Sequence, residues 1–203
     1  MDGTLVNSGT IISNTINHVR VNVGLEPMPK NILLENINNP HINPSEFFYE
    51  TKEFTNKHSN LFEAYYDKHY LESIELYDSI SLLLEKLKSE NYILSIATNA
   101  SSEFAIKITQ HLDIFKYFDY IIGYDNVKEP KPAPDMINKT MLKLGFESSK
   151  SILVGDSQKD LLSAKSANID SILVNWGFSN HQTDVCNNTD ELYNKINLIF
   201  SNK

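Results

Sequence analysis

The chain has 203 residues, of which 41% are hydrophobic, and it carries a formal net charge of −8. This length and composition predict a globular chain with one sizeable core, as one domain or one domain with an insertion. The acidic balance, with a pI near 5.2, argues against a nucleic-acid or anionic-membrane surface, because either partner needs a basic patch. A small anion held locally is not excluded.

The sequence has one cysteine, Cys186, and no Cys/His cluster with the spacing of zinc ligands. One thiol cannot form an internal disulfide, so a reducing compartment is expected and Cys186 is interpreted as a spectator. No apolar stretch approaches the roughly 20 residues of a membrane span. The N-terminus also lacks the basic-then-apolar layout of a secretion signal. We therefore expect a cytoplasmic protein without a membrane partner.

The first residues contain Asp2-Gly3-Thr4-Leu5, an acidic segment whose glycine lets the backbone turn or pass close to a ligand. The stretch that follows, up to about residue 76, has helical spacing. One apolar helical face, with Gly24 as a stop signal, is formed by Ile12, Ile16, Val19 and Val23. Two aromatic-rich helices are predicted next, for packing between helices. One starts at Asn43-Pro44 and holds Phe47, Phe48 and Phe54, and the other holds Phe62, Tyr65, Tyr66 and Tyr70.

From about residue 78 onward, apolar runs alternate with helical patterns, which is typical of a parallel sheet covered by helices on both faces. Strands are predicted at residues 92–97, 120–122, 151–154 and 171–174. The helices between them are predicted from their caps and apolar stripes. The first is capped by Asp78 and buries Leu82, Leu83, Leu84 and Leu87, and the next covers residues 103–112. The third runs from about Pro134 to Gly145. The fourth contains Leu161, Leu162, Ala164 and Ala167, and the fifth contains Leu192, Ile196 and Ile199.

Two carboxylates, Asp156 and Asp160, come directly after the predicted strand at residues 151–154. Ligands of open α/β sheets bind beyond the carboxyl ends of the strands, and Mg²⁺ prefers one or two carboxylates together with waters and substrate oxygens. Asp156 is therefore a candidate metal ligand, because a carboxylate after an apolar strand needs a cation or hydrogen bonds to offset its desolvation. For Asp160 a second interpretation stands equal, since Ser157-x-x-Asp160 also has the pattern of a helix capping box.

Two further segments offer phosphate-binding groups. Thr98-Asn99 ends the predicted strand at residues 92–97, where a hydroxyl and a backbone N–H can hold a phosphate oxygen. The alternative role is that of a helix cap, shared with Ser101 or Ser102. Lys131 lies among three prolines in Glu129-Pro130-Lys131-Pro132-Ala133-Pro134, whose restricted backbone can hold an amine in place.

In this order, Asp2-Gly3-Thr4-Leu5, Thr98-Asn99, Lys131-Pro132 and Gly155-Asp156-Ser157-x-x-Asp160 resemble the four motifs of the haloacid dehalogenase-like hydrolases. The resemblance spans essentially the whole chain. It implies a Rossmann-like, doubly wound parallel sheet with an inserted helical cap. The core is then expected at residues 1–9 and 77–203, and the cap at residues 10–76.

The resemblance also implies a magnesium-dependent phosphatase that works through an aspartyl-phosphate intermediate. Asp2 matches the family's general acid/base, and its backbone carbonyl, with Asp156 and Asp160, is expected at the metal. Thr98, Asn99 and Lys131 are then the phosphate ligands, with Lys131 also counted as catalytic. An anionic nucleophile and a phosphate dianion repel each other by several kcal/mol at an effective dielectric near 20, so such cations are needed.

In this family, the attacking aspartate stands two residues before the position of Asp2, at the end of a central strand. We expect both upstream of Met1 in this protein. The strands that end at Thr98 and Asp156 flank that strand, and without it they would face a gap of about two 4.8 Å spacings. The alternatives are a catalytically inactive protein that binds a phosphorylated metabolite or a partner, a sugar-phosphate phosphatase or phosphoglucomutase relative, and a haloacid dehalogenase.

Within the family, Val174-Asn175-Trp176-Gly177 and the position of the helical insertion look most similar to the phosphoglycolate phosphatase branch. A small phosphorylated, phosphoglycolate-like metabolite is therefore the expected partner, and the choice between monomer and homodimer stays open. Arg20 and His41 are interpreted as a surface arginine and a loop histidine and are left out of the site.

Overall fold

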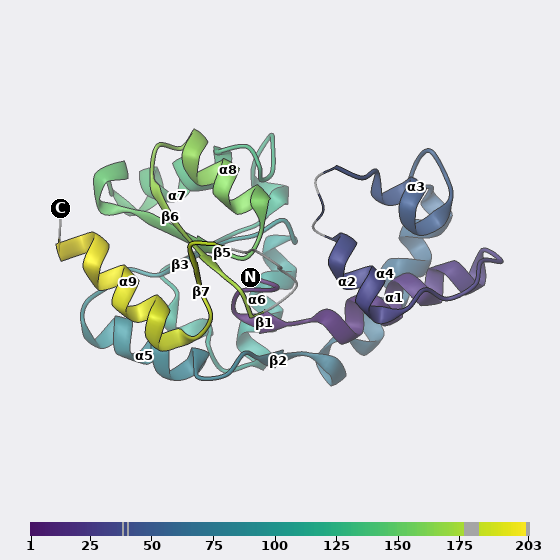
Figure 1. The fold of residues 1–203 in the computed structure, drawn as a ribbon, viewed down its shortest axis with the longest axis horizontal. Helices are drawn as coiled ribbons and strands as arrows, with labels where there is room; N and C mark the ends of the chain where they lie inside the picture. Colours follow the sequence, from purple (N-terminus) through teal and green to yellow (C-terminus); the bar gives the residue numbers. More distant parts are fainter. Residues whose placement is uncertain (38, 40, 177–182, 202–203) are drawn as a thin grey trace.

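The computed structural model describes residues 1–37, 39, 41–176 and 183–201 of the chain. Figure 1 shows two lobes, a larger one in which strands lie between helices and a smaller one made of helices. No helix of the described ranges is long and apolar enough to cross a membrane.

The strands in the described residues form three separate hydrogen-bonded sheets, in the orders β1-β2, β3-β4 and β5-β6-β7. The pairs β3-β4, β5-β6 and β6-β7 are parallel, whereas β1-β2 is antiparallel. The pairs β3-β4 and β5-β6, each joined through a helix, confirm the expected α/β class. The bounds are β1 Val6–Asn7, β2 Glu75–Leu76, β3 Ser95–Ala97, β4 Tyr120–Ile122, β5 Ile152–Gly155, β6 Asp170–Val174 and β7 Val185–Cys186.

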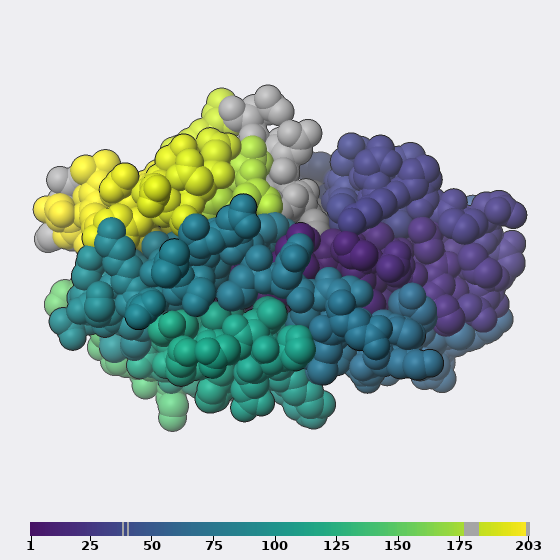
Figure 2. Space-filling model, turned by 90° about the horizontal axis from the view of Figure 1, so that it is seen from below, coloured from purple at the N-terminus to yellow at the C-terminus, as the bar shows by residue number. Residues whose placement is uncertain are grey.

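Helices pack against these strands from both sides in the larger lobe. α5 and α9 lie side by side (Figure 2) and share one apolar cluster with β6 and β7, while α8 packs on the other side of β5 and β6 (Figure 1). The helices are α5 Ile80–Ser89, α6 Ser102–His111, α7 Asp135–Leu144, α8 Gln158–Ser166 and α9 Thr189–Ser201. Short 3₁₀ turns occur at η1 Phe115–Tyr117, η2 Tyr124–Asn126 and η3 Ser148–Lys150.

The smaller lobe has a core of its own, and α1 packs along α4 in it. Its helices are α1 Gly9–Asn22, α2 Lys30–Ile37, α3 Pro44–Tyr49 and α4 Asn56–Ser73. The buried side chains of this core are Ile16, Val19, Leu33, Phe48 and Tyr49. α3 begins where the Asn43-Pro44 pair predicts, because the Asn43 side chain accepts from Ser45 N and Glu46 N.

A two-stranded ribbon, β1-β2, connects the lobes (Figure 1). Val6 pairs with Leu76 and Asn7 pairs with Glu75, so the chain enters and leaves the smaller lobe side by side. The Asn7 side-chain amide also donates to the Glu75 carboxylate at 3.1 Å. The short ribbon has no period-2 run of apolar residues, which explains why the sequence does not predict it.

Several local predictions are wrong, each for a physical reason. Asp78 does not cap α5. The helix is preceded by Ser79 in the left-handed region, at φ 61°, and Ile80 N donates to Tyr77 O. Leu82 is 68% exposed, because the buried stripe of α5 is made of Ile80, Leu83, Leu84 and Leu87. Phe54 lies outside α3 and is partly exposed.

The strand predicted at residues 92–97 is shortened to β3, residues 95–97. Leu94 N donates at 2.9 Å to the Asp119 carboxylate instead of to a neighbouring strand. β7 was not predicted from the sequence either, since it has only two residues. Its Cys186 is buried with the side chains of α9, which is the packing role expected of a spectator thiol.

A cavity of about 450 Å³ lies between the facing edges of β3 and β5. Ser95, Ile96 and Ala97 of β3 line one side, and Ile152, Leu153 and Val154 of β5 line another. Apolar side chains of α5, α7 and α9 also line it, as does Met1. The edges of β3 and β5 therefore do not pair with each other, and the sheet is divided where its central strand is expected.

Candidate active site

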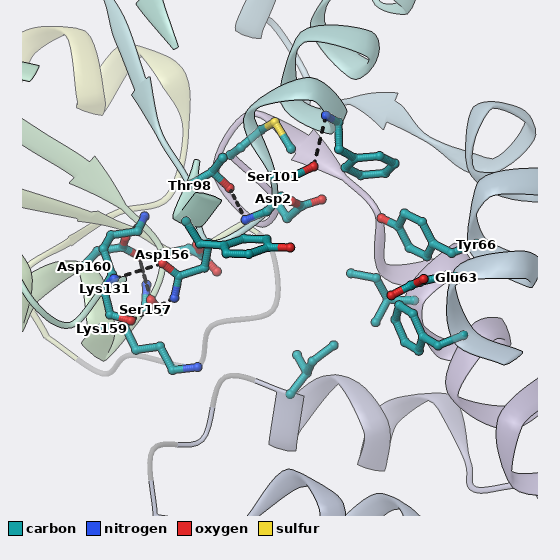
Figure 3. Close-up of a pocket in the computed structure, with 18 of the residues that line it drawn as sticks. Asp2, Glu63, Tyr66, Thr98, Ser101, Lys131, Asp156, Ser157, Lys159 and Asp160 are labelled. Atoms are coloured by element: carbon teal, nitrogen blue, oxygen red, sulfur yellow. Dashed lines mark hydrogen bonds and ion pairs between the residues drawn. The ribbon is translucent and has the colours of Figure 1, made fainter. Parts of the chain in front are cut away.

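The four sequence motifs meet at one pocket of about 580 Å³ between the two lobes. Thr98 directly follows β3 and Asp156 directly follows β5, so the carboxyl ends of two parallel strands face the same space. Figure 3 shows Lys131, Asp156 and Asp160 on one side of it, and Glu63 and Tyr66 of α4 across from them. All the predicted site residues line the pocket, namely Asp2, Thr98, Asn99, Lys131, Asp156 and Asp160.

Asp2 is held in a tight loop at the start of the chain. The carbonyl of Met1 accepts from the backbone N–H groups of Thr4, Leu5 and Val6, at 2.8–3.2 Å. The Ser8 hydroxyl donates to Asp2 Oδ1 at 2.5 Å, which fixes the carboxylate. This loop is the local reason that a carboxylate from the first residues reaches the strand ends.

Gly3 is the turn residue of this loop and lies against Asp156. Its φ of +73° is in the left-handed region, and a Cβ built on it would collide with the Asp156 carboxylate. Thr4 donates through its hydroxyl to Asp156 Oδ1 at 3.1 Å. The Asp2-Gly3-Thr4 segment therefore positions the carboxylate of the fourth motif as well as its own.

Asp156 is buried, with 3% of its surface exposed. Burial raises the pKa of this carboxyl above its ordinary value, and the neighbouring Asp160 carboxylate raises it further. The N-terminal amine, the Thr4 hydroxyl and Lys131 oppose the shift. A cation at this carboxylate would offset the desolvation, as expected from its place after an apolar strand.

Asp160 and Lys131 form a buried ion pair, with Nζ 2.7 Å from Oδ1 and side chains 9% and 7% exposed for Lys131 and Asp160. The other oxygen of Asp160 accepts from Ser157 N at 3.1 Å and from the Ser157 hydroxyl at 2.6 Å. Burial alone would raise the pKa of Asp160, but the Lys131 ammonium and these hydrogen bonds hold it below its ordinary value. One oxygen of Asp160 thus belongs to the ion pair with Lys131, and the other belongs to the capping box with Ser157.

Lys131 is fixed at three points. Its ammonium also donates to the carbonyl of Ala97, at the end of β3, at 2.7 Å. The side chain of Asn99 bonds to its backbone twice, from Nδ2 to Lys131 O at 2.8 Å and from Lys131 N to Oδ1 at 3.0 Å. Asn99 therefore uses both ends of its side-chain amide to position Lys131, and the contact of its backbone N–H with phosphate stays a prediction.

Thr98 is 4% exposed, and its hydroxyl accepts from Ala100 N at 3.2 Å. Its own backbone N–H donates to Ile122 O of β4, which continues the strand ladder to the edge of the pocket. Ser101, not Thr98, caps α6, because Ser101 Oγ accepts from Phe104 N. The hydroxyl hydrogen of Thr98 thus remains available for an oxygen in the pocket.

The expected metal site is only partly formed by side chains. In the described ranges, no group of three or more His, Cys, Asp or Glu residues has the arrangement of a metal centre. Because both oxygens of Asp160 contact Lys131 or Ser157, the candidate oxygen ligands for a metal ion are Asp156 and the Asp2 segment. Direct ligation by Asp160 stays a prediction, and it competes with the ion pair to Lys131.

The pocket includes residues that the sequence did not single out, and α4 supplies most of them: Phe62, Glu63, Tyr66 and Asp67. Lys159 was also missed, although it lies inside the Ser157-x-x-Asp160 motif, and Figure 3 shows its amine pointing into the pocket. The predicted helix packing of the α4 aromatic residues is confirmed, and Phe62 and Tyr66 line the pocket in addition. No spacing rule in the sequence indicates which face of a cap helix meets the core.

Arg20 is a further correction. It is buried, not a surface arginine, and its guanidinium donates to the carbonyls of Glu26 and Phe48 within the smaller lobe. His41 is exposed, as expected of a loop histidine. Neither residue lines the pocket, so leaving both out of the site agrees with the structure.

Trp176 has a structural contact with the first motif. Its indole N–H donates to Thr4 O at 3.0 Å, which ties the segment after β6 to the loop that carries Asp2. Gly177, the last residue of the segment that resembles the phosphoglycolate phosphatase branch, lies outside the described residues.

Comparison with known proteins agrees with this geometry. The family described as haloacid dehalogenase-like hydrolase matches residues 1–174. A phosphoglycolate phosphatase of Aquifex aeolicus is 31% identical over 183 residues, which cover 88% of this chain and 83% of that protein. Another, from Photorhabdus laumondii, is 26% identical over 94% of this chain and 84% of its own length.

Among solved structures, a predicted phosphatase from Clostridium acetobutylicum superposes with a TM-score of 0.86 at 26% identity, covering 98% of this chain and 95% of its own. A putative β-phosphoglucomutase from Thermotoga maritima, at 21% identity, shares the fold with a TM-score of 0.75, covering 98% of this chain and 96% of its own. The chain belongs to the haloacid dehalogenase-like hydrolases, within their phosphoglycolate phosphatase-like branch of phosphatases.

Proposed function

We propose that the pocket is the site of a magnesium-dependent phosphatase that hydrolyses a small phosphorylated metabolite in the cytoplasm. One observation carries the proposal: Asp2, Thr98, Lys131 and Asp156 come from four separate segments and line a single pocket. Phosphoglycolate, the substrate in the names of several relatives, is the reference compound for this activity.

The residues of the chain divide the work by their chemistry. Lys131, held by Ala97 O and Asp160, places a fixed ammonium against the phosphoryl oxygens. Thr98 donates its hydroxyl to one of these oxygens. Asp2, fixed by Ser8, gives a proton to the leaving oxygen and later takes one from the attacking water. Positive charge is required here, since two unit charges of like sign 4 Å apart repel by about 4 kcal/mol at an effective dielectric of 20.

The donors at the strand ends fit Mg²⁺. They are all oxygens, and Mg²⁺ takes one or two carboxylates while keeping water and substrate oxygens. Asp156 and the backbone carbonyl of Asp2 would hold the ion, and Asp160 would support it through Lys131 and Ser157. A bound Mg²⁺ would supply positive charge to the phosphoryl oxygens as the reaction proceeds.

The attacking carboxylate is proposed to be an aspartate upstream of Met1, at the end of a strand that occupies the cavity between β3 and β5. The support is geometric. The facing edges of β3 and β5 do not pair, and the cavity meets the active-site pocket at Met1 and Lys131, which line both. An extended segment leading into Met1 would pair with both edges and deliver its last residues to the phosphate site. The reaction would then pass through an aspartyl-phosphate.

Hydrolysis of p-nitrophenyl phosphate with Mg²⁺ tests the proposal. It is measured for residues 1–203 and for a chain extended upstream through the expected aspartate. We expect turnover by the extended chain, its loss on chelation of the metal, and its loss in the extended chain that carries Asp2→Asn. Inactivity of both chains would contradict the proposal in favour of a binding protein. Turnover of a haloacid without metal would contradict it in favour of a dehalogenase.

A further inference from the structure

The active-site pocket has two walls of different chemistry. The core wall carries the groups described above for phosphate and metal. The cap wall is built from α1, α2 and α4, and its lining residues are Ile12, Ile37, Phe62, Glu63, Tyr66 and Asp67. Figure 3 shows Glu63 and Tyr66 facing the core residues across the pocket. A phosphate ester bound at the core wall must direct its alcohol portion toward this cap wall.

The cap wall is acidic. Glu63 and Asp67 lie one turn apart on α4, and both are exposed to the pocket and solvent. Among the described residues that line the pocket, the only lysines or arginines are Lys131 and Lys159, and both belong to the core wall. The buried arginine of the cap, Arg20, is bonded to backbone carbonyls away from the pocket.

Between the acidic side chains, the cap wall is aromatic and uncharged. Tyr66 stacks on Phe62, with ring centroids 5.7 Å apart at an interplanar angle of 11°, and it also packs against Phe104 of α6 at 5.1 Å. Burial raises the pKa of Tyr66, and the charge of Asp2 raises it further, so its hydroxyl stays protonated. This wall offers van der Waals contact and a neutral hydroxyl to the alcohol portion of a substrate.

We propose that the cap wall selects phosphate monoesters whose alcohol portion is uncharged or cationic, and that it disfavours a second anion such as the carboxylate of phosphoglycolate. The inference rests on the proposed function of the core wall. A carboxylate placed near Glu63 and Asp67 meets like charges, and the described residues of that wall carry no cation, since the amine of Lys159 belongs to the core wall. Such juxtaposition gives specificity by exclusion. The chain would thus differ in substrate from the relatives whose names mention phosphoglycolate.

The test uses three esters of nearly equal size whose far ends differ in charge: phosphoglycolate, its amide, and phosphoethanolamine. Binding to residues 1–203 with Mg²⁺ is measured by calorimetry, and hydrolysis is followed in parallel with the extended chain. The variant Glu63→Gln/Asp67→Asn removes both charges of the cap wall. Glu72→Gln is the matched control, because Glu72 is exposed on the same helix and does not line the pocket.

We expect the amide and phosphoethanolamine to bind about tenfold more tightly than phosphoglycolate, which corresponds to about 1.4 kcal/mol. The double variant should tighten phosphoglycolate binding toward that of the amide, and Glu72→Gln should leave the ranking unchanged. Phosphoglycolate binding as tightly as the amide, or a gap that survives the double variant, would overturn the inference while hydrolysis by the extended chain keeps the proposed function. Failure of all three esters to bind would overturn both.

Discussion

At the scale of single residues, the two carboxylates of the fourth motif have different surroundings. Asp156 faces the first motif and takes a hydrogen bond from Thr4, whereas Asp160 is paired with Lys131 and Ser157. The sequence places both at the end of one strand but does not separate them, because a capping box and a metal motif share the same spacing. Only the contacts of the two oxygens of Asp160 distinguish a supporting residue from a ligand.

Substitution of each aspartate by asparagine should separate these roles. Asp156→Asn is expected to abolish saturable Mg²⁺ binding, since it removes the charged donor. Asp160→Asn should keep binding, weakened by about 10- to 100-fold as for other supporting residues. It should also lower the free energy of unfolding by about 3 kcal/mol, because Lys131 is left as a buried, unpaired charge. Calorimetric Mg²⁺ titration and denaturant unfolding measure the two effects, and the reverse pattern would exchange the assignments.

Gly3 provides a second test at this scale, with a matched control in the same chain. Gly3→Ala places a methyl group against the Asp156 carboxylate, whereas Gly24, with φ +88°, has no atom within 4 Å of the corresponding position. Both substitutions should cost about 1–2 kcal/mol for a left-handed backbone. Only Gly3→Ala should also weaken Mg²⁺ binding. Equal Mg²⁺ affinity in the two variants would show that the contact between Gly3 and Asp156 does not position the carboxylate.

At the scale of elements, the sequence predicts where parallel strands end better than where they begin. Thr98 and Asp156 follow strands as expected, because polar residues after apolar runs mark the carboxyl ends. The sequence predicts the start of β3 three residues too early, since Tyr92, Ile93 and Leu94 are apolar but their strand ladder is interrupted. Leu94 N is bonded to the side chain of Asp119, and no local pattern shows such a long-range acceptor.

Asp119 therefore holds the beginning of β3, and its contribution should depend on pH. Burial alone would raise its pKa, but hydrogen bonds from Lys88 and Leu94 N, at 2.8 and 2.9 Å, lower it. A lowered carboxyl pKa in the folded state adds stability above the unfolded value of about 3.9, and that stability is lost as the pH falls through the folded pKa.

Asp119→Asn should accordingly reduce the free energy of unfolding by about 1 kcal/mol at pH 7, a modest value because the pair is partly exposed. The difference from the unaltered chain should shrink once the pH falls below about 4. Urea unfolding at several pH values measures it, with Asp113→Asn as a control from an exposed ion pair. A difference that stays constant down to pH 2 would mean that the carboxylate charge has no part in holding β3.

At the scale of the whole molecule, the fold class and the convergence of the motifs were predictable, because motif order and β-α alternation fix which strand ends meet. The facing wall of the pocket was not, since Glu63 and Tyr66 reach it only through the packing of α4 against α1 and the path of the β1-β2 ribbon. The gap between β3 and β5 was expected from the resemblance, and the structure shows a cavity at that place.

A strand that occupies this cavity should raise the melting temperature of the protein. The cavity of about 450 Å³ leaves the facing edges of β3 and β5 without strand partners, and an apolar strand placed there would pair both edges and bury apolar surface. A chain extended upstream by an apolar strand should therefore melt about 10 °C or more above residues 1–203. Thermal unfolding of the two chains measures this, and equal melting temperatures would contradict strand insertion between β3 and β5.

The account as a whole depends on one claim, that side chains from four segments bind a phosphate group together with Mg²⁺. Calorimetric titration of inorganic phosphate into residues 1–203, with and without Mg²⁺, tests it most directly because it needs neither turnover nor an upstream segment. We expect saturable, Mg²⁺-dependent binding that is lost in Lys131→Met and Asp156→Asn. The claim would be contradicted if the unaltered chain did not bind phosphate, or if both variants bound phosphate as tightly as the unaltered chain.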